Sequence, residues 1–205
     1  MTPPLVAVAS AALQPYDVRL TGAPGHRIVI RRGTADVEAA MATTGLSLTM
    51  MLAMLGARRA HISAGRKPRP YHIAAPTLDA GSASTWDRFT LNLWALRMGL
   101  FHDRAGGWVP LIGYAGLALV MGVEEQTVRS WASDDPDSQR RHADFPAAAC
   151  EIDTEGVVTC PLFPVFEARR FGQRLGRIDP KTSAEDIPRL VVAEALRRAA
   201  PTGRG

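Results

Sequence analysis

The sequence has few cysteines, few aromatic residues and none of the motifs of the common enzyme classes. Cys150 and Cys160 are the two cysteines among 205 residues, so the fold is not built on a disulfide framework. The five histidines are scattered without metal-ligand spacing. A Walker loop, a nucleophile elbow and a GxGxxG segment are all missing from the sequence. We therefore expect a binding protein and not an enzyme, with no cofactor and no metal.

The composition is that of a globular protein. Charged residues make up 21 % and apolar residues 46 % of the chain, which disfavours both a disordered chain and a membrane bundle. Two charge-free runs, 39–57 and 105–123, are long enough to span a membrane, but Thr, Ser and Gly interrupt the first, and Gly and Pro the second. The segment MTPPLVAVASAAL lacks the basic region of a secretory signal. We expect a cytoplasmic protein with reduced cysteines and no membrane association.

Positive charge is concentrated in the first half of the chain. The formal net charge is +4 and the pI is near 9.6, which favours an anionic partner. By segment, the net charge is 0 for 1–25, +6 for 26–104, −3 for 105–178 and +1 for 179–205. An anionic partner is therefore expected to meet mainly residues 26–104.

The N-terminal region, 1–105, is predicted to be basic and α-rich. Alternating polar and apolar residues on both sides of TGAPG predict a β-hairpin within 17–32. Ser84 followed by Asp87 is typical of a capping box, and apolar residues then recur at helical spacing, which predicts a helix at 85–102. We interpret the aromatic residues of that helix as core.

The C-terminal part, 179–205, is predicted to be a helix and a tail. Ser183 and Asp186 form a capping pair, and Pro188 suits the first turn. The signals agree on about four turns. The pattern leaves open whether this helix packs on the rest of the chain or on a second subunit.

The segment YAGLALVMGVEEQTVRSWAS fits the template of a helix-turn-helix. Gly122 falls at the sharp turn, where φ > 0 is needed, and Ala118 falls where the helices cross. Apolar residues fill the five positions between the helices, which are Leu117, Met121, Val123, Val128 and Trp131. The second helix then directs five residues outward, where base edges and phosphates would lie: Gln126, Thr127, Arg129, Ser130 and Ser133.

Glu124 and Glu125 begin the second helix of this template. Carboxylates in a first turn complement the helix dipole. If they point into a DNA groove, a carboxylate can instead accept a hydrogen bond from a cytosine amino group. Both interpretations remain open.

The segment CEIDTEGVVTC is predicted to be a β-hairpin. Its loop is Thr154-Glu155-Gly156, with glycine at the left-handed position. This register pairs Ile152 with Val158 and Cys150 with Cys160. We expect a reduced cysteine pair, which would be able to form a disulfide on oxidation.

Together these features resemble a known family. Asp144-Phe145-Pro146 precedes the hairpin and VFEARRFGQRLGR (165–177) follows it. With these, the segment 109–178 resembles the small winged helix-turn-helix proteins of the excisionase, AlpA and MerR-like group. The resemblance implies DNA binding through a recognition helix, with a two-stranded wing near the DNA backbone and a short closing helix after it.

The segment departs from that pattern in its charge. The insert 132–143 begins with acidic residues, and the wing tip carries Asp153 and Glu155. Phosphate would repel such a wing. We therefore expect backbone contacts from this module to come from arginines instead: Arg129, Arg140, Arg141, Arg169 and Arg170.

A weaker match to the same template lies at 48–67, with Gly56 at the turn. Its outward side would be basic, and would present Arg58, Arg59, His61 and Ser63, with Arg66, Lys67 and Arg69 just beyond. The segment is a second helix-turn-helix, a plain basic patch that contacts phosphates, or an ordinary solvated surface.

We therefore expect a mainly α fold with small β elements, in which a winged helix-turn-helix at 109–178 follows an α-rich N-terminal region. The expected function is sequence-specific binding of double-stranded DNA, in transcription regulation or as an excisionase-like accessory factor of a mobile element. A homodimer is common among such proteins. The alternative is a helix-turn-helix scaffold for protein recognition, in which the acidic surface 132–155 meets a basic protein partner.

Overall fold

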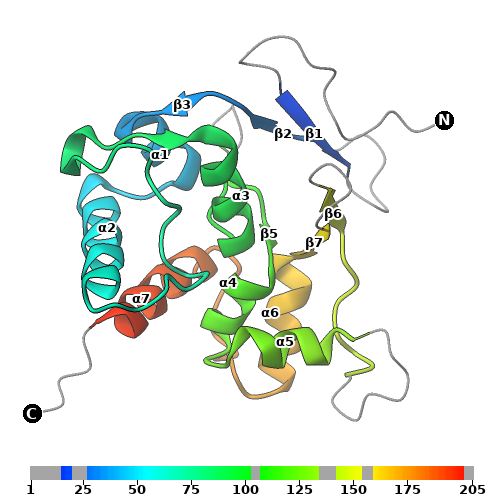
Figure 1. The fold of residues 1–205 in the computed structure, drawn as a ribbon. Helices are drawn as coiled ribbons and strands as arrows, with labels where there is room; N and C mark the ends of the chain where they lie inside the picture. Colours follow the sequence, from blue (N-terminus) through cyan, green and yellow to red (C-terminus); the bar gives the residue numbers. More distant parts are fainter. Residues whose placement is uncertain (1–14, 20–26, 103–106, 134–141, 154–158, 201–205) are drawn as a thin grey trace, which may run out of the picture.

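The chain is built mainly from helices. A computed structural model describes residues 15–19, 27–102, 107–133, 142–153 and 159–200 (Figure 1). Within these ranges the α-helices are α1 (Val37–Thr44), α2 (Leu48–Ser63), α3 (Arg88–Met98), α4 (Tyr114–Val120), α5 (Glu125–Trp131), α6 (Val165–Arg174) and α7 (Ile187–Ala199), and η1 (Gly81–Ala83) is a short 3₁₀ turn. The mainly α fold predicted from the sequence is confirmed.

The described strands form three small sheets. They are β1 (Pro15–Arg19), β2 (Arg27–Arg31), β3 (Thr34–Ala35), β4 (Trp86–Asp87), β5 (Leu111–Ile112), β6 (Cys150–Asp153) and β7 (Thr159–Pro164). β1 pairs with β2 and β3 pairs with β4, while the third sheet has the order β5-β7-β6. β1 and β2 are antiparallel, with Asp17 opposite Val29, which confirms the hairpin predicted within 17–32.

A single apolar core joins the helices. It extends from Ile30 to Ala195 and is centred on α3, where Leu91, Ala95 and Leu96 are fully buried. Figure 1 shows α2 and α7 on one side of α3 and α4, with α6 and the sheet β5-β7-β6 on the other. The loop 65–80 is attached to this core because the Trp86 indole N–H donates to the Ala74 carbonyl at 3.0 Å.

Helix α3 is shorter than the sequence pattern predicted. It begins after Asp87, whose carboxylate accepts from the Thr90 N–H at 2.8 Å, and it ends at Gly99, which has φ +74°. Ser84 is not the cap, because its hydroxyl accepts from the Ala80 N–H instead. The predicted span of 85–102 was too long because buried Leu100 continues the apolar pattern beyond the helix end.

The C-terminal helix α7 is confirmed, and it packs on the rest of the chain. The Asp186 carboxylate accepts from the N–H and the hydroxyl of Ser183, at 2.9 and 2.7 Å. Pro188 lies in the first turn, as the sequence indicated. Val191 and Val192 are buried where α7 lies against α2 and α4.

Of the three interpretations of the segment 48–67, the second helix-turn-helix is wrong, because α2 is one continuous helix through Gly56. A glycine within a helix costs only about 1 kcal/mol relative to alanine. Buried Met51, Met54 and Leu55 fix one face of the helix in the core and outweigh that cost. Gly56 itself is exposed, and a methyl group added there would meet nothing within 4 Å.

The hairpin predicted at 150–160 does contain paired strands, but in another register and in a larger sheet. Its predicted loop, 154–156, and Val158, the predicted partner of Ile152, lie outside the described residues. Cys150 lies opposite Leu162, and Cys160 lies opposite Ile152, so the predicted Cys150–Cys160 pair is wrong. A shift of two residues keeps the same faces apolar, so alternation alone could not fix the register. β7 also pairs with β5, with Ile112 opposite Phe163, so the sheet has three strands and not two.

Among the described residues, no single helix has the length and apolar character needed to cross a membrane. Helices α1 and α2 meet that criterion only when taken together, and the pair is bent by 101°.

Candidate functional site

Helices α4 and α5 meet at a sharp turn. Gly122 has φ +66°, a conformation that favours glycine, and the Val123 N–H donates to the Ala118 carbonyl at 2.9 Å. Leu117, Ala118 and Met121 are at most 3 % exposed, and Val128 of α5 is fully buried. Four of the seven template residues are therefore core, and Val123 and Trp131 pack at its edge.

The outward side of α5 is accessible. Gln126 and Arg129 are exposed, while Thr127, Ser130 and Ser133 are half-buried. The Ser130 hydroxyl donates to the Gln126 carbonyl at 2.9 Å, a bond within the helix. This side of the helix therefore presents amide and guanidinium groups to a partner.

Arg129 already has two neighbours in the structure. Its Nε donates to the Glu125 carboxylate at 3.0 Å, and its guanidinium lies 4.7 Å from the Tyr114 ring centroid. About half of its side chain remains exposed. An ion pair as exposed as this contributes at most about 1 kcal/mol, so a partner can displace it.

Glu124 is the N-cap residue of α5, and its side chain makes no capping hydrogen bond. It is 84 % exposed and lies 3.8 Å from the Arg198 guanidinium. The dipole interpretation and the cytosine interpretation both remain compatible with this position. Glu125, in contrast, is held by Arg129.

A cleft with a volume of about 400 Å³ lies beside α5. Four arginines from four separate segments line it: Arg58 of α2, Arg69 of the loop 65–80, Arg97 of α3 and Arg129 of α5. Glu125 is the one carboxylate among the described residues that line it. Leu93, Ile73 and Pro161 add apolar surface. The cleft is therefore cationic on its rim and partly apolar on its walls.

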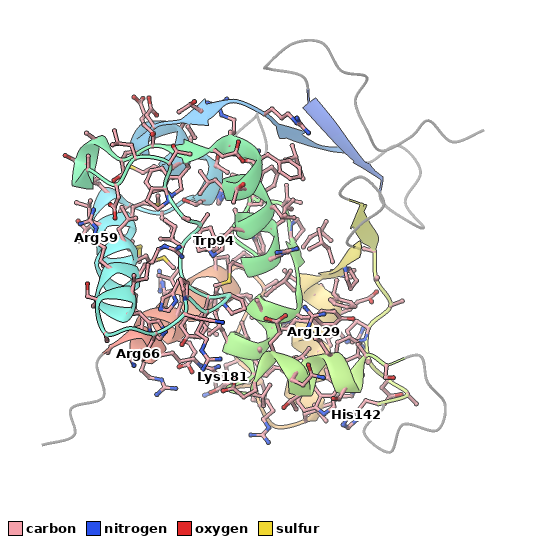
Figure 2. The ribbon with its side chains drawn as sticks, viewed as in Figure 1. Arg59, Arg66, Trp94, Arg129, His142 and Lys181 are labelled. Carbon is pink, nitrogen blue, oxygen red and sulfur yellow. The ribbon has the colours of Figure 1, made fainter. Side chains whose placement is uncertain are left out.

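Two buried nitrogen atoms, in residues that line the cleft, lack hydrogen-bond partners within the described part of the chain. They are Nε2 of His72 and Nε1 of Trp94, whose residues are 4 % and 7 % exposed. Figure 2 shows Trp94 of α3 in the middle of the molecule, on the side of α3 that faces α2. An unpaired buried N–H is costly, on the order of 1–3 kcal/mol, and such groups are uncommon.

His72 is held as a neutral imidazole. Its Nδ1 accepts from the Arg69 N–H at 2.8 Å, so the proton of the neutral ring is on Nε2. Burial, together with nearby His61 and the arginines Arg58, Arg66 and Arg69, lowers its pKa to about 4. Near neutral pH the ring therefore offers one N–H donor.

The predicted basic residues of 58–67 do not share one surface. Arg58 lines the cleft and donates to the Ile73 carbonyl at 3.3 Å, and burial lowers its pKa. Arg59 instead forms an ion pair with Asp79, which raises the pKa of Arg59. In Figure 2, Arg59 lies on the outer side of α2, well away from Arg129.

His61 is not an outward DNA contact, and that prediction is wrong. The residue is 6 % exposed, and its Nε2 donates to the Lys67 carbonyl at 2.9 Å. Arg66 and Lys67 are exposed on the loop that follows α2. The prediction that His61 faces outward assumed a turn at Gly56. In the continuous helix α2, His61 faces the core instead.

Some of the other arginines that were predicted to contact the DNA backbone lie outside the described residues. Arg140 and Arg141 lie in the range 134–141, which the structure does not describe. Arg169 donates to the Thr182 carbonyl at 2.8 Å, so it ties α6 to the segment before α7. Arg170 is exposed, with its guanidinium 5.7 Å from the Phe166 ring centroid. Much of the acidic surface 132–155 also falls in the ranges 134–141 and 154–158.

Sequence inspection missed the residues that complete the cleft. Arg97, His72 and Trp94 come from a helix and a loop that no local motif connects. Trp94 was interpreted as core, which its burial supports, but its indole N–H faces no acceptor in the described ranges. These residues were missed because they lie far apart in the sequence. The spacing of residues along the chain carries no information about groups that only the tertiary fold brings together.

A smaller hollow, of about 220 Å³, lies between the end of α5 and the segment 142–148. Phe145 of the predicted Asp-Phe-Pro loop packs edge-on against Phe163 and Phe171, with ring centroids 5.1 Å apart in each case. Arg174 donates to the Asp144 carbonyl at 3.1 Å. This loop therefore serves as packing between α6 and the sheet.

Comparisons with protein families, with curated proteins and with solved structures gave no match to this chain. Among the described residues, no three His, Cys, Asp or Glu side chains converge in a way that would hold a metal ion. A function for the protein is therefore inferred from the geometry around α5.

Proposed function

We propose that the protein binds double-stranded DNA sequence-specifically, with α4 and α5 as a helix-turn-helix and α5 as the recognition helix. The observation that carries the proposal is the orientation of α5. Val128 is fully buried while Gln126 and Arg129, on its other side, are exposed. Amide and guanidinium side chains are those that pair with adenine and guanine edges in the major groove.

The charge beside α5 supports the same proposal. Arg58, Arg69 and Arg97 line the cleft that Arg129 borders, so positive charge adjoins the recognition helix despite the net negative charge of the segment 105–178. Exposed Arg69 is the best placed of them to meet a phosphate. Phosphate contacts of this kind orient a protein on the duplex but carry no sequence information.

Two details complete the proposed module. The sheet β5-β7-β6 takes the place of the wing, and α6 is the closing helix. The biological role is regulation of transcription or accessory work in a mobile element. A homodimer would place two copies of α5 in successive major grooves.

Protein recognition is the competing function, and one observation favours it. Arg129 is occupied by Glu125 and Tyr114, so the outward face of α5 is less cationic than that of a typical DNA-binding helix. In that case α5 and the acidic surface 132–155 would contact a basic protein. The two functions can be told apart by whether the protein binds duplex DNA, and by how that affinity depends on salt concentration and on DNA sequence.

Fluorescence anisotropy with genomic and random duplexes, over a series of salt concentrations, tests the proposal. With about four phosphate contacts, affinity should fall roughly 100-fold between 50 and 200 mM salt. Arg129→Ala should weaken binding about tenfold or more. Arg59→Ala, which removes an arginine away from the cleft, should change it little. Absence of binding at low salt, or binding without a salt slope, would overturn the proposal.

A further inference from the structure

The outer face of α6 presents an aromatic ring to solvent. Phe166 is 52 % exposed, and no other aromatic side chain that the structure describes is exposed to this extent. Val165, Ala168 and Phe171 of the same helix are buried, so Phe166 points away from the core. A single exposed apolar residue is ordinary on a protein surface, so its neighbours decide whether it belongs to a site.

The neighbours of Phe166 on this face are arginines. Arg169 and Arg170 follow it at the helical spacings of three and four residues, and their guanidinium carbons lie 5.2 and 5.7 Å from the centroid of its ring. A guanidinium at this distance is attracted by the aromatic ring. Exposed Arg174 continues the same row one turn further along. The face therefore combines one apolar anchor with arginines that already have a preferred position.

The rest of the fold holds α6 in place beneath this face. On its buried side Phe171 packs edge-on against Phe145, with ring centroids 5.1 Å apart. Arg169 donates to the Thr182 carbonyl at 2.8 Å, and Arg174 donates to the Asp144 carbonyl at 3.1 Å. A partner would therefore have to order few side chains, which lowers the entropic cost of binding.

The charge of α6 and of the turn after it is positive. Residues 165–177 contain four arginines and one carboxylate, Glu167, so their net charge is 4 − 1 = +3. Arg170 and Arg177 are exposed, and neither forms an ion pair within the described part of the chain. Arg197 of α7, in contrast, is paired with Glu194. Complementarity of charge therefore requires an anionic partner for α6.

An acidic protein segment fits this face better than nucleic acid or lipid does. Contacts to a duplex backbone are electrostatic and make no use of an exposed ring. Proteins that bind single strands stack successive bases on several aromatic side chains, and a lipid surface takes up a row of apolar residues, whereas α6 exposes only Phe166. Aromatic residues and arginine are enriched in protein interfaces, and guanidinium groups bind carboxylates through paired hydrogen bonds.

We propose that the outer face of α6 is a docking surface for an acidic protein segment, in which an apolar side chain covers Phe166 and flanking carboxylates bind Arg170 and Arg174. Arg170 is thereby assigned to a protein partner and not to the DNA backbone contact expected from the sequence. On the buried side of α6, Phe171 contacts Trp131 of α5, with ring centroids 5.9 Å apart. The docking surface is therefore distinct from the outward side of α5, and it does not depend on the proposed DNA binding.

Selection from a random peptide library displayed on phage, against the full chain, tests the docking surface. We expect the enriched peptides to carry aspartate or glutamate on both sides of an apolar residue. Fluorescence anisotropy of the labelled consensus peptide then measures its affinity. Phe166→Ala should weaken binding about tenfold or more, as the loss of an interface anchor does. Arg170→Gln should weaken it about fivefold, the upper range for an exposed charge pair. A selection without acidic sequences, or equal affinities in the wild type and Phe166→Ala, would overturn the proposal.

Two matched variants control for general effects of lost apolar surface and lost charge. Leu78→Ala truncates an apolar side chain that is 54 % exposed, and Arg66→Gln removes one exposed positive charge. Leu78 precedes Asp79, which binds Arg59 of α2, and Arg66 follows α2. Figure 1 shows α2 on the other side of α3 and α4 from α6. Each control should leave peptide affinity within about twofold, and thermal denaturation should show that Phe166→Ala is folded.

Measurements with nucleic acid separate the docking surface from the proposed DNA binding. Phe166→Ala should leave the affinities for a random duplex and for an oligothymidylate within about twofold, since the substitution removes no charge. If it weakens nucleic-acid binding as much as it weakens peptide binding, the ring contacts nucleic acid and the docking surface is wrong. A wild type that binds no duplex at low salt contradicts the proposed function alone, because the peptide measurements contain no DNA.

Discussion

The guanidinium of Arg198, near the C-terminal end of α7, donates to the backbone carbonyl of Val123 at 3.1 Å. Val123 follows the turn glycine between α4 and α5, 75 residues earlier in the chain. The same guanidinium is oriented by Glu194 at 2.8 Å, and its side chain is only 16 % exposed. The C-terminal helix therefore fixes the position of the turn that precedes the proposed recognition helix.

Arg198→Ala should loosen that turn and destabilise the protein by about 1–2 kcal/mol, because it leaves a partly buried carbonyl and the Glu194 carboxylate without this donor. Urea denaturation measures the change. The matched control is Arg197→Ala, since Arg197 also pairs with Glu194 but is 71 % exposed. An equal, small effect of both substitutions would show that the contact with Val123 contributes nothing.

Acid should weaken the attachment of α7. Hydrogen bonds from Arg197 and Arg198 lower the pKa of Glu194 to about 2. A carboxylate with a lowered pKa stabilises the fold above its unfolded pKa near 4.5 and loses that contribution as pH falls toward 2. The loss should be on the order of 2 kcal/mol. Denaturation curves between pH 5 and pH 2 should show it for the wild type and not for Glu194→Gln.

Stability should also depend on His72, in a higher pH range. Its pKa is about 4 in the fold, against an ordinary value of 6.5, so the unfolded chain takes up the proton first. Stability is therefore complete above pH 6.5 and falls as pH decreases toward 4, by roughly 2 kcal/mol. Charged or titratable neighbours that face the ring are His61, Arg58, Arg66 and Arg69. His72→Asn should remove this dependence of stability on pH, measured by urea denaturation between pH 7 and pH 4. If the variant keeps the pH dependence of the wild type, another group and not His72 is responsible for it.

Two glycine substitutions should change the stability of the fold in opposite directions. Gly122 has φ +66°, so Gly122→Ala should destabilise by about 1–2 kcal/mol even though a methyl group would meet nothing there. Gly56 lies inside α2 with space around it, so Gly56→Ala should stabilise by about 0.5–1 kcal/mol. Thermal denaturation of both variants measures this, and destabilisation by Gly56→Ala would mean that α2 is broken there after all.

Local signals in the sequence were sufficient for elements whose own residues determine them. Asp186 and Pro188 marked the start of α7, and the seven template residues marked two short helices with a glycine turn between them. The same template failed at Gly56. A glycine between two helical segments is compatible with a sharp turn and with a continuous helix, and the sequence does not reveal which φ the glycine adopts. Buried Met51 and Leu55, known only from the fold, decided that case.

Long-range relationships were beyond local patterns. The strand register missed by two residues because a shift of two preserves the apolar faces. The cleft was missed because Arg58, His72, Trp94 and Arg129 meet only after α2, α3 and α5 pack. Arg198 carried no sign of its contact with Val123.

The proposed selection of DNA sequence by the exposed side of α5 can be tested as a ratio of two affinities. One is for a duplex selected by this protein from a random pool, and the other is for its scrambled version, in the wild type and in Gln126→Ala/Arg129→Ala. We expect the double substitution to lower that ratio about 100-fold, as two base contacts of about 1–3 kcal/mol each would require, while weak binding to scrambled DNA persists. A ratio that does not change, or a selection that enriches no sequence, would contradict sequence recognition by α5.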